Sequence, residues 1–236
     1  MAEVHPGVQS SSTQFVSDTA TLQGFLARPS VEGRRPALLV IQEWWGLNDH
    51  IREICERFAR EGYVVLAPDL YSRMGAGKVT KDGAEAAKWM ESLQTQQVLR
   101  DLNAAVTHVK TFPFVDPLKL AVVGFCMGGS FALMMAGHNS DLKAAVPFYG
   151  QIPPSDSFRY LLCPVLYVYG AQHGWIPKTD VERLRQGLQQ QGKPGEVVIY
   201  PDAGHAFFND TRPEAYRPND AQDAWRRTLS FLSTHL

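Results

Sequence analysis

The sequence of 236 residues has little of what marks several specialised classes of protein. Its 23 Lys and Arg residues are balanced by 24 Asp and Glu residues, which leaves a formal net charge of −1. A chain so nearly neutral gives no electrostatic reason to expect nucleic acid or an anionic membrane as a partner. Its apolar runs are also too short to cross a bilayer. We therefore expect a small-molecule ligand, with neither nucleic acid nor a membrane as partner.

Cysteine is scarce as well. The three cysteines, Cys55, Cys126 and Cys163, provide neither a disulfide framework nor a Cys-x-x-Cys metal pair. The first residues of the sequence show neither the basic segment nor the apolar segment of a secretory signal. These absences favour a protein of the reducing cytoplasm.

Short apolar segments of strand type alternate with helical patterns through most of the chain. Ahead of them, turn-forming residues 17–19 lie between two β-prone segments and predict a hairpin at a sheet edge. Alternation of this kind favours a mainly parallel sheet covered by helices on both faces, in a single α/β domain over residues 1–236. The expected strands are 13–16, 22–27, 37–41, 63–67, 120–123, 144–148, 165–169 and 196–200, and the expected helices include 49–60, 84–93, 98–110 and 130–136.

Two more helices are expected toward the end of the chain. Thr179 and Glu182 have the spacing of a capping box, and Asn219 is a favourable N-cap for a closing helix.

Side chains able to carry chemistry recur just after the predicted strands. In parallel sheets, ligands bind beyond the C-terminal ends of the strands. The residues that fall there are Glu43, Asp69, Cys126, the pair Gln172-His173, and His205.

Residues 119–129 lead from a buried-strand pattern into a helical one and read Lys-Leu-Ala-Val-Val-Gly-Phe-Cys-Met-Gly-Gly. This is the pattern of a nucleophile elbow, a sharp strand-to-helix turn with the nucleophile, here Cys126, at its tip. Gly124 and Gly128 are expected because a Cβ at either position would collide with neighbouring backbone. The N-terminal end of a helix favours thiolate over thiol, and its N–H groups can hold an oxyanion.

Other interpretations of these residues are open. A five-residue match to this pattern also arises by chance, and a lone cysteine beside apolar residues is usually a small core residue. The strand-turn-helix context favours the nucleophile. Thiol attack on an acyl carbonyl needs a base, and His205, on a Gly-flanked loop after the last expected strand, can provide it. The alternative for His205 is an ordinary turn histidine.

Three segments now resemble one family: Gln-Glu-Trp-Trp-Gly at 42–46, Gly-Phe-Cys-Met-Gly-Gly at 124–129, and Ala-Gly-His-Ala-Phe at 203–207. Pro-Asp-Leu-Tyr at 68–71 is also similar, and the match in order and spacing covers roughly residues 36–210. The chain resembles the dienelactone hydrolases, a cysteine-dependent branch of the α/β-hydrolase fold. The resemblance implies that fold and hydrolysis of an ester or lactone without a metal or an organic cofactor.

The resemblance also implies roles for individual residues. Cys126 would be the nucleophile, His205 the general base, and Glu43 a carboxylate near the thiol that activates it when substrate arrives. The oxyanion hole would combine the backbone N–H of Met127 with that of Trp44. For Glu43 the alternative is a solvated group at a strand end.

Two positions depart from the family's pattern. Relatives carry an aspartate in the turn after the strand expected at 165–169, and this chain has His173 in the acid's place. Relatives that bind a substrate carboxylate have an arginine four residues after the catalytic histidine, where this chain has Asn209. These departures argue against dienelactone itself as the substrate.

The leading expectation is a hydrolase of small lactones or short esters that acts through a Cys126 thioester, as a monomer or a small homo-oligomer. A catalytically weakened ligand-binding member is the alternative, because His173 replaces the acid. A thiol redox protein is a third class, for which no resolving cysteine is evident. A segment with Gly75 and Gly77 is long enough to overhang the site. Aromatic side chains would wall an apolar pocket or belong to the core: Trp44, Trp45, Tyr71, Trp175, Phe207 and Phe208.

Overall fold

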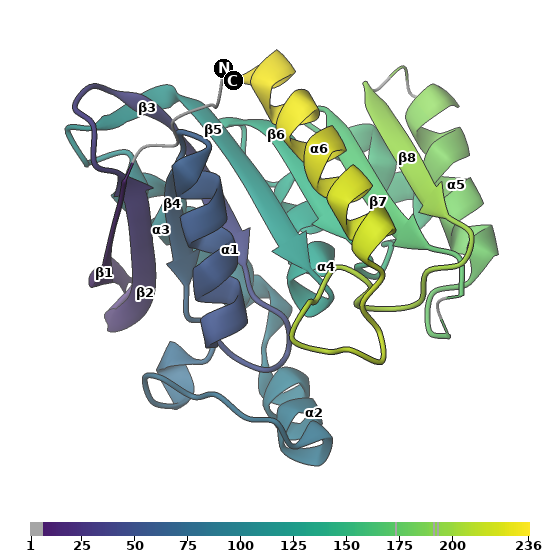
Figure 1. Ribbon diagram of the computed structural model, residues 1–236, viewed down its shortest axis with the longest axis horizontal. Coiled ribbons are helices and arrows are strands. Elements are labelled where there is room, and N and C mark those ends of the chain that lie inside the picture. Colours follow the sequence, from purple (N-terminus) through teal and green to yellow (C-terminus); the bar gives the residue numbers. More distant parts are fainter. Residues whose placement is uncertain (1–6, 173, 191, 193) are drawn as a thin grey trace. The chain divides into compact units, whose positions relative to one another are not determined.

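The computed structural model describes residues 7–172, 174–190, 192 and 194–236. Its strands form an eight-stranded sheet in the order β1-β2-β4-β3-β5-β6-β7-β8 (Figure 1). The chain divides into two compact units, Met1–Leu120 and Ala121–Leu236, and the division falls inside β5 (Val115–Phe125). Each unit is described by itself.

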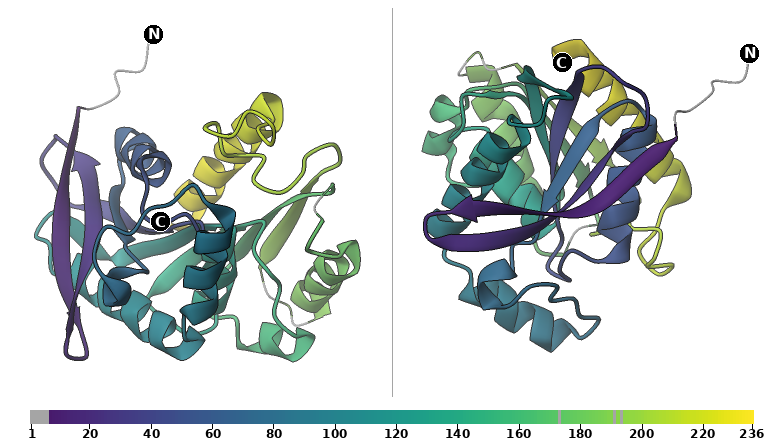
Figure 2. Two further views of the ribbon diagram at one scale, coloured as in Figure 1. Left: turned by 90° about the horizontal axis from the view of Figure 1, so that it is seen from below. Right: turned by 90° about the vertical axis from the view of Figure 1, so that its left-hand side faces the viewer.

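The first unit begins with the predicted hairpin, formed by β1 (Val8–Ser17) and β2 (Ala20–Pro29), which is purple in Figure 2. Strand β2 also pairs antiparallel with β4 (Val64–Pro68), and β4 pairs parallel with β3 (Arg35–Ile41). Both hairpin strands are longer than predicted, because backbone pairing extends beyond the apolar residues into the exposed serines of β1. The predicted position of β1 at a sheet edge is confirmed.

Helices α1 (Asp49–Arg60) and α3 (Thr95–Val109) lie on opposite faces of the strands of the first unit (Figures 1 and 2). Helix α1 spans the predicted residues because the Asn48 side chain caps it, accepting a hydrogen bond from the Ile51 N–H at 3.1 Å. The short helices η1 (Ser72–Met74) and α2 (Gly83–Ser92) connect β4 to α3.

In the second unit, β6 (Leu142–Phe148), β7 (Val165–Gly170) and β8 (Gly195–Tyr200) pair in parallel. Helix α4 (Met127–Met135) packs on β6 from one face, and α6 (Pro218–His235) packs on β6 and β7 from the other (Figures 1 and 2). Helix α5 (Lys178–Gln190) contacts β8 and η2 (Ser155–Tyr160). The predicted α/β class with a mainly parallel sheet is confirmed.

The predicted N-caps Thr179 and Asn219 are wrong, since both residues lie inside the first turn of their helices. The carbonyl of Pro177 already accepts a hydrogen bond from the Asp180 N–H at 2.9 Å, and the carbonyl of Arg217 accepts one from Ala221 at 2.8 Å. Pro218 is the first residue of α6, where its fixed φ suits the helix and its missing N–H costs nothing. Proline therefore sets the start of α6.

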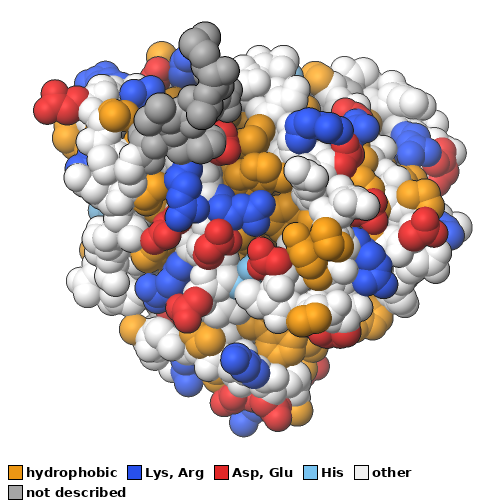
Figure 3. Space-filling view, viewed as in Figure 1, with side chains coloured by type: hydrophobic (Ala, Val, Ile, Leu, Met, Phe, Trp, Pro, Cys, Tyr) orange, Lys and Arg blue, Asp and Glu red, His pale blue; other side chains and the backbone are white. Residues whose placement is uncertain are grey.

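Two surface properties bear on possible partners. On the face shown in Figure 3, acidic and basic side chains are interspersed, in agreement with a formal net charge of −1. Within the described ranges, no helix has both the length and the apolar character that crossing a membrane requires.

Candidate active site

The turn between β5 and α4 has the geometry of the predicted elbow. Cys126 adopts φ 55° and ψ −118°, a region that a residue with a Cβ rarely enters. Its N–H donates to the Phe148 carbonyl of β6 at 3.1 Å, and its carbonyl accepts from the Ser130 N–H at 3.2 Å. The first bond ties the turn to the neighbouring strand, and the second begins α4. The thiol is therefore held at the N-terminal end of a helix, and it is partly exposed.

Glycines allow this turn to pack closely. A Cβ on Gly124 would lie 2.0 Å from the Gly128 carbonyl oxygen, which confirms the predicted requirement at position 124. A Cβ on Gly129 would lie 2.4 Å from the carbonyl oxygen of Phe148. Any larger residue at either position would force the elbow away from α4 or from β6.

His205 lies beside the thiol, with its Nε2 atom 3.1 Å from Cys126 Sγ. It is carried by the loop that follows β8. That loop is fastened to the turn after β7, where the Gln172 N–H donates to the Ala203 carbonyl at 2.8 Å. A Cβ on Gly170 would lie 2.6 Å from the Gly204 carbonyl oxygen, so the two segments approach more closely than a side chain would allow. This spacing permits direct proton exchange between the thiol and the imidazole.

Two aromatic rings flank the imidazole. The Trp175 ring centroid is 4.7 Å from that of His205, and the Tyr149 centroid is 5.1 Å away. Trp175 is 65% exposed, whereas Tyr149 is buried and also contacts Phe207. Tyr149 is not among the predicted site residues; the Tyr-Gly pair that follows β6 is the sequence signal that could have found it.

Backbone strain gathers around the same pair. In the parts of the chain that the structure describes, the non-glycine residues with positive φ are Asp18, Cys126, Tyr149 and Ala206. Asp18 lies in the turn of the β1–β2 hairpin, where aspartate is tolerated. The other three are the thiol, a ring neighbour of His205, and the residue that follows His205. Such strain persists only where the surrounding structure enforces it, and it is common at functional sites.

The other two cysteines have the properties of core residues. Cys55 lies on the inward face of α1, and burial raises the pKa of its thiol. Burial also raises the pKa of Cys163, to about 12. Both thiols are protonated near neutral pH, so neither is an effective nucleophile.

The remaining predicted residues on the N-terminal side belong to the first unit. Glu43 follows β3 and is 1% exposed, so it is not the solvated group of the alternative interpretation. The Trp44 and Trp45 rings meet edge to face, with centroids 4.9 Å apart. The buried Tyr71 donates its hydroxyl to the Trp44 carbonyl at 2.8 Å.

The segment around Gly75 and Gly77 is fixed to this loop and is not a loose overhang. The Thr80 N–H donates to the Trp45 carbonyl at 3.1 Å, and Gly46 forms a bridge with Val79. A Cβ on Gly46 would lie 2.0 Å from the Lys78 carbonyl oxygen. These contacts hold the loop that carries Glu43 and the Trp44 N–H.

Asp69 binds the backbone of the same segment around Gly75 and Gly77. Its carboxylate accepts hydrogen bonds from the N–H groups of Tyr71 and Gly77, each at 3.0 Å. Burial raises the pKa of Asp69, although these two hydrogen bonds oppose the change. The predicted strand-end carboxylate therefore orders a turn.

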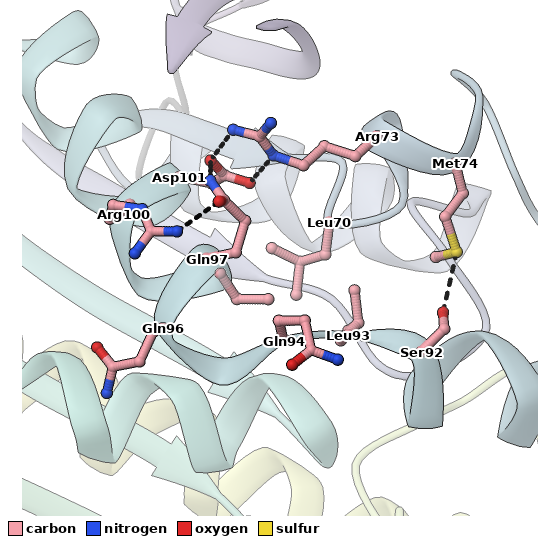
Figure 4. Close-up of a pocket in the computed structure, with 11 residues that line it drawn as sticks. Leu70, Arg73, Met74, Ser92, Leu93, Gln94, Gln96, Gln97, Arg100 and Asp101 are labelled. Atoms are coloured by element: carbon pink, nitrogen blue, oxygen red, sulfur yellow. Dashed lines mark hydrogen bonds and ion pairs between the residues drawn. The ribbon is translucent and has the colours of Figure 1, made fainter. Parts of the chain in front are cut away.

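A cavity of about 300 Å³ lies in the first unit between η1, the end of α2 and the start of α3 (Figure 4). Charged and polar groups of its wall bind one another: Arg73 forms two hydrogen bonds to Asp101, at 2.7 and 2.8 Å, Gln97 donates to the same carboxylate at 3.0 Å, and Arg100 donates to Gln97. Apolar side chains, Leu70 and Leu93 among them, make up much of the rest of the wall. The Ser92 hydroxyl of its wall donates to the Trp89 carbonyl at 2.7 Å, and the polar groups of the cavity stabilise the fold.

Within the second unit, the structure thus brings together Cys126, Met127 as the first residue of α4, His205 and Trp175. Phe207 lies one aromatic contact further on, and Phe208 packs in the core against Phe125 and Phe148. His173 lies outside the described residues. Among residues that the structure does describe, no group of three or more His, Cys, Asp or Glu side chains could hold a metal ion.

Comparison with known proteins gives one consistent family. The model of the dienelactone hydrolase family matches residues 22–236. A Yersinia pestis protein provisionally named carboxymethylenebutenolidase is 36% identical over an alignment that covers 97% of this chain and 90% of the relative. A protein of Escherichia coli K12 with the same provisional name is also 36% identical, over 94% of this chain and 86% of its own length.

A solved structure agrees with these sequences. A Klebsiella pneumoniae protein, provisionally named dienelactone hydrolase, superposes with a TM-score of 0.90 at 34% identity, covering 96% of this chain and 99% of that one. The match extends over both units and includes the elbow. The family model alone covers more than half of the sequence. The fold is therefore an α/β-hydrolase fold, and the chain belongs to the dienelactone hydrolase family.

Proposed function

We propose that this protein is a cytoplasmic hydrolase of small lactones or short esters, acting through a thioester on Cys126. The observation that carries the proposal is the distance of 3.1 Å between Cys126 Sγ and His205 Nε2 at a strained strand-to-helix turn. A thiol in such a position can give its proton to the imidazole and attack an acyl carbonyl. The hydrolase names of the relatives support this reaction, and nothing in the comparisons favours the ligand-binding alternative.

In the first half of the reaction, Cys126 Sγ bonds to the carbonyl carbon, and the carbonyl oxygen becomes an oxyanion. His205 holds the proton that came from the thiol. When the oxyanion collapses, the bond between the carbon and the alcohol oxygen breaks, and the alcohol leaves with the proton from His205. In a lactone the alcohol stays attached to the acyl chain.

In the second half, His205 takes a proton from water, and the resulting hydroxide attacks the thioester carbon. The tetrahedral intermediate collapses, the carbon–sulfur bond breaks, and Cys126 leaves as thiolate. The products are a carboxylic acid and the regenerated pair. No redox change and no co-reactant other than water is needed.

Other residues have proposed roles that follow the family pattern. The N–H groups of Met127 and Trp44 stabilise the oxyanion, and Glu43 exchanges a proton with the thiol. The proposed pocket is apolar, with Trp45, Tyr71, Trp175 and Phe207 in its walls. The bond from Tyr71 to the Trp44 carbonyl supports the first of these roles, since it fixes the loop that carries the Trp44 N–H.

The test is incubation with p-nitrophenyl acetate and with a simple lactone, followed by intact mass and peptide mapping. We expect continuous turnover with one acetyl group transiently on Cys126, and neither in Cys126→Ala. Cys163→Ala is the matched control, because it removes a buried thiol and should keep full turnover. A folded protein without adduct or turnover would indicate a binding function. Rapid peroxide consumption with sulfenic acid at Cys126 would indicate redox chemistry.

A further inference from the structure

The imidazole of His205 lies between two aromatic side chains that come from different segments of the chain. Trp175 follows β7 and Tyr149 follows β6, and both ring centroids lie about as far from the imidazole as the ring partners in cation–π contacts. Both residues contact His205 through their rings.

Each ring is held beside His205 by an arrangement that is unfavourable in itself. Tyr149 adopts φ 41°, a strained value for a residue with a side chain, and its N–H is fixed by the Val168 carbonyl at 2.8 Å. Trp175 leaves 65% of its surface exposed, more than is usual for an indole in a folded protein. Core packing does not explain the exposure of Trp175. Both features are expected if the position of each ring relative to His205 matters.

We propose that Tyr149 and Trp175 are positioning residues that orient His205 and stabilise its imidazolium form, and thereby favour the thiolate–imidazolium pair over the neutral pair. This inference rests on the proposed function, since it concerns the same Cys126–His205 pair. Aromatic ring faces carry negative potential and attract a cation within about 6 Å. Neutral imidazole gains much less from the same neighbours. The rings therefore stabilise the charged form more than the neutral one.

Other titratable groups near the imidazole must be held constant. Two of these groups contact His205 directly, the Cys126 thiol and the Tyr149 side chain with its hydroxyl. Glu43 and His173, which the sequence predicts beside the pair, are unchanged in every variant below. Asp202, on the loop that carries His205, is unchanged as well.

The experiment measures alkylation of Cys126 by iodoacetamide from pH 5 to pH 10, with peptide mapping to exclude the two buried thiols. Trp175→Leu and Tyr149→Leu remove a ring but keep apolar bulk. Trp175→Phe and Tyr149→Phe keep a ring. We expect each Leu variant to react about two- to fivefold more slowly near neutral pH and to reach the full rate only at higher pH, because less of the thiol is ionised. The Phe variants should stay close to wild type.

A proton-sensitive readout separates this role from simple packing. The imidazole C2–H resonance of His205 should titrate at lower pH in the Leu variants, whereas a packing defect alone would not move it in that direction. Equal effects of Leu and Phe, or Leu profiles that superimpose on wild type, would overturn the proposal. Loss of fold in Tyr149→Leu leaves Trp175→Leu, an exposed position, as the deciding variant. Alkylation does not require ester turnover, so a wild type without esterase activity would refute the proposed function alone.

Discussion

The ionisable groups of the two units differ in their surroundings. In the first unit, the buried carboxylate of Asp101 is surrounded by donors: Arg73 binds it twice, Ser17 at 2.6 Å and Gln97 at 3.0 Å. In the second unit, the Cys126 thiol and the His205 imidazole have each other at 3.1 Å, and the backbone around them is strained. The first cluster is a charged carboxylate held by several donors, whereas the second is a thiol–imidazole pair at a strained turn.

This difference separates a structural cluster from a reactive one. Burial alone would raise the pKa of Asp101, but the hydrogen bonds from Arg73, Ser17 and Gln97 outweigh it and lower the pKa below its ordinary value. A carboxylate with so many donors stays charged near neutral pH and does not exchange protons readily. A pair that must pass a proton and form a covalent bond needs two protonation states of similar free energy. The surrounding fold stabilises that pair by enforcing positions that isolated residues would avoid.

The largest expected effect comes from Cys126 itself. Cys126→Ala and Cys126→Gly should both lose ester turnover by at least about 10³-fold, because the nucleophile is gone. Their stabilities should differ. Alanine keeps a Cβ at φ 55° and should match wild type, whereas glycine relieves the strain and should gain about 1 kcal/mol after its own entropy cost. Turnover of p-nitrophenyl acetate and urea unfolding measure the two effects.

Contrary results would be informative at this position. Retained turnover in Cys126→Ala would remove the thiol from the mechanism. A glycine variant less stable than the alanine variant would show that the elbow is not strained, and the contrast between the units would lose its basis.

The next effect concerns stability in the first unit. Asp101→Asn should destabilise the protein by about 2 kcal/mol, since it removes the charge that Arg73 binds and leaves fewer acceptors for Ser17 and Gln97. Asp18→Asn is the matched control, because that side chain is 51% exposed and asparagine tolerates its positive φ, so it should change little. Activity per folded molecule should be unchanged in both. Urea unfolding at neutral pH checks the difference.

The Asp101 contribution should also depend on pH with a definite sign. Because the folded-state pKa is lowered, the stabilisation is fully present above the unfolded value of about 4 and is lost as the pH falls through the folded value. The difference in free energy of unfolding between wild type and Asp101→Asn should therefore be constant near neutral pH and should become smaller below about pH 4. A gap that widens on acidification would contradict this assignment.

The sequence predicts some parts of this picture well, for physical reasons. Helix α1 has its predicted ends because Asn48 caps it and the glycine at 62, with φ +97°, ends it locally. The elbow is predictable because Gly124 is required by contacts within a few residues. Both signals are local and need no knowledge of the rest of the fold.

Other parts depend on contacts that no local pattern reports. The strain at Tyr149 arises only when β6 and β7 pair, since its N–H binds Val168. The Arg73–Asp101 cluster joins residues 28 positions apart, and Ser17 comes from 84 positions away. The predicted starts of α5 and α6 are wrong because the favourable capping residues Thr179 and Asn219 lie one residue inside helices that begin at Lys178 and Pro218.

A smaller effect is expected at position 173, which the sequence alone addresses. His173→Asp should raise kcat/KM on a small activated ester by roughly tenfold, because a carboxylate behind His205 would stabilise imidazolium, as in serine triads. His173→Ala is the control. The preceding residue, Gln172, donates its N–H to the carbonyl of Ala203, two residues before His205. No gain in the Asp variant, or equal impairment of both variants, would show that position 173 is not the acid position of this site.

The smallest effect is expected for Glu43, which tests the contrast between the two units directly because it lies in the first unit and is proposed to act on Cys126 and His205 in the second. If Glu43 is a structural carboxylate like Asp101, its charge stabilises the loop after β3. If it exchanges a proton with Cys126, its charge instead affects the ionisation of the thiol. Glu43→Gln keeps the shape and removes the charge, so a structural role predicts lower stability with an unchanged pH profile of Cys126 alkylation. The proposed role predicts a few-fold slower acylation by p-nitrophenyl acetate and a profile displaced along the pH axis, because one titrating neighbour is gone.

Asp69→Asn is the matched control. The Asp69 carboxylate is also buried after a strand of the same unit, but it binds the N–H groups of Tyr71 and Gly77, so removing its charge should lower the stability of the protein. Superimposable alkylation profiles for wild type and Glu43→Gln would place Glu43 with the structural carboxylates.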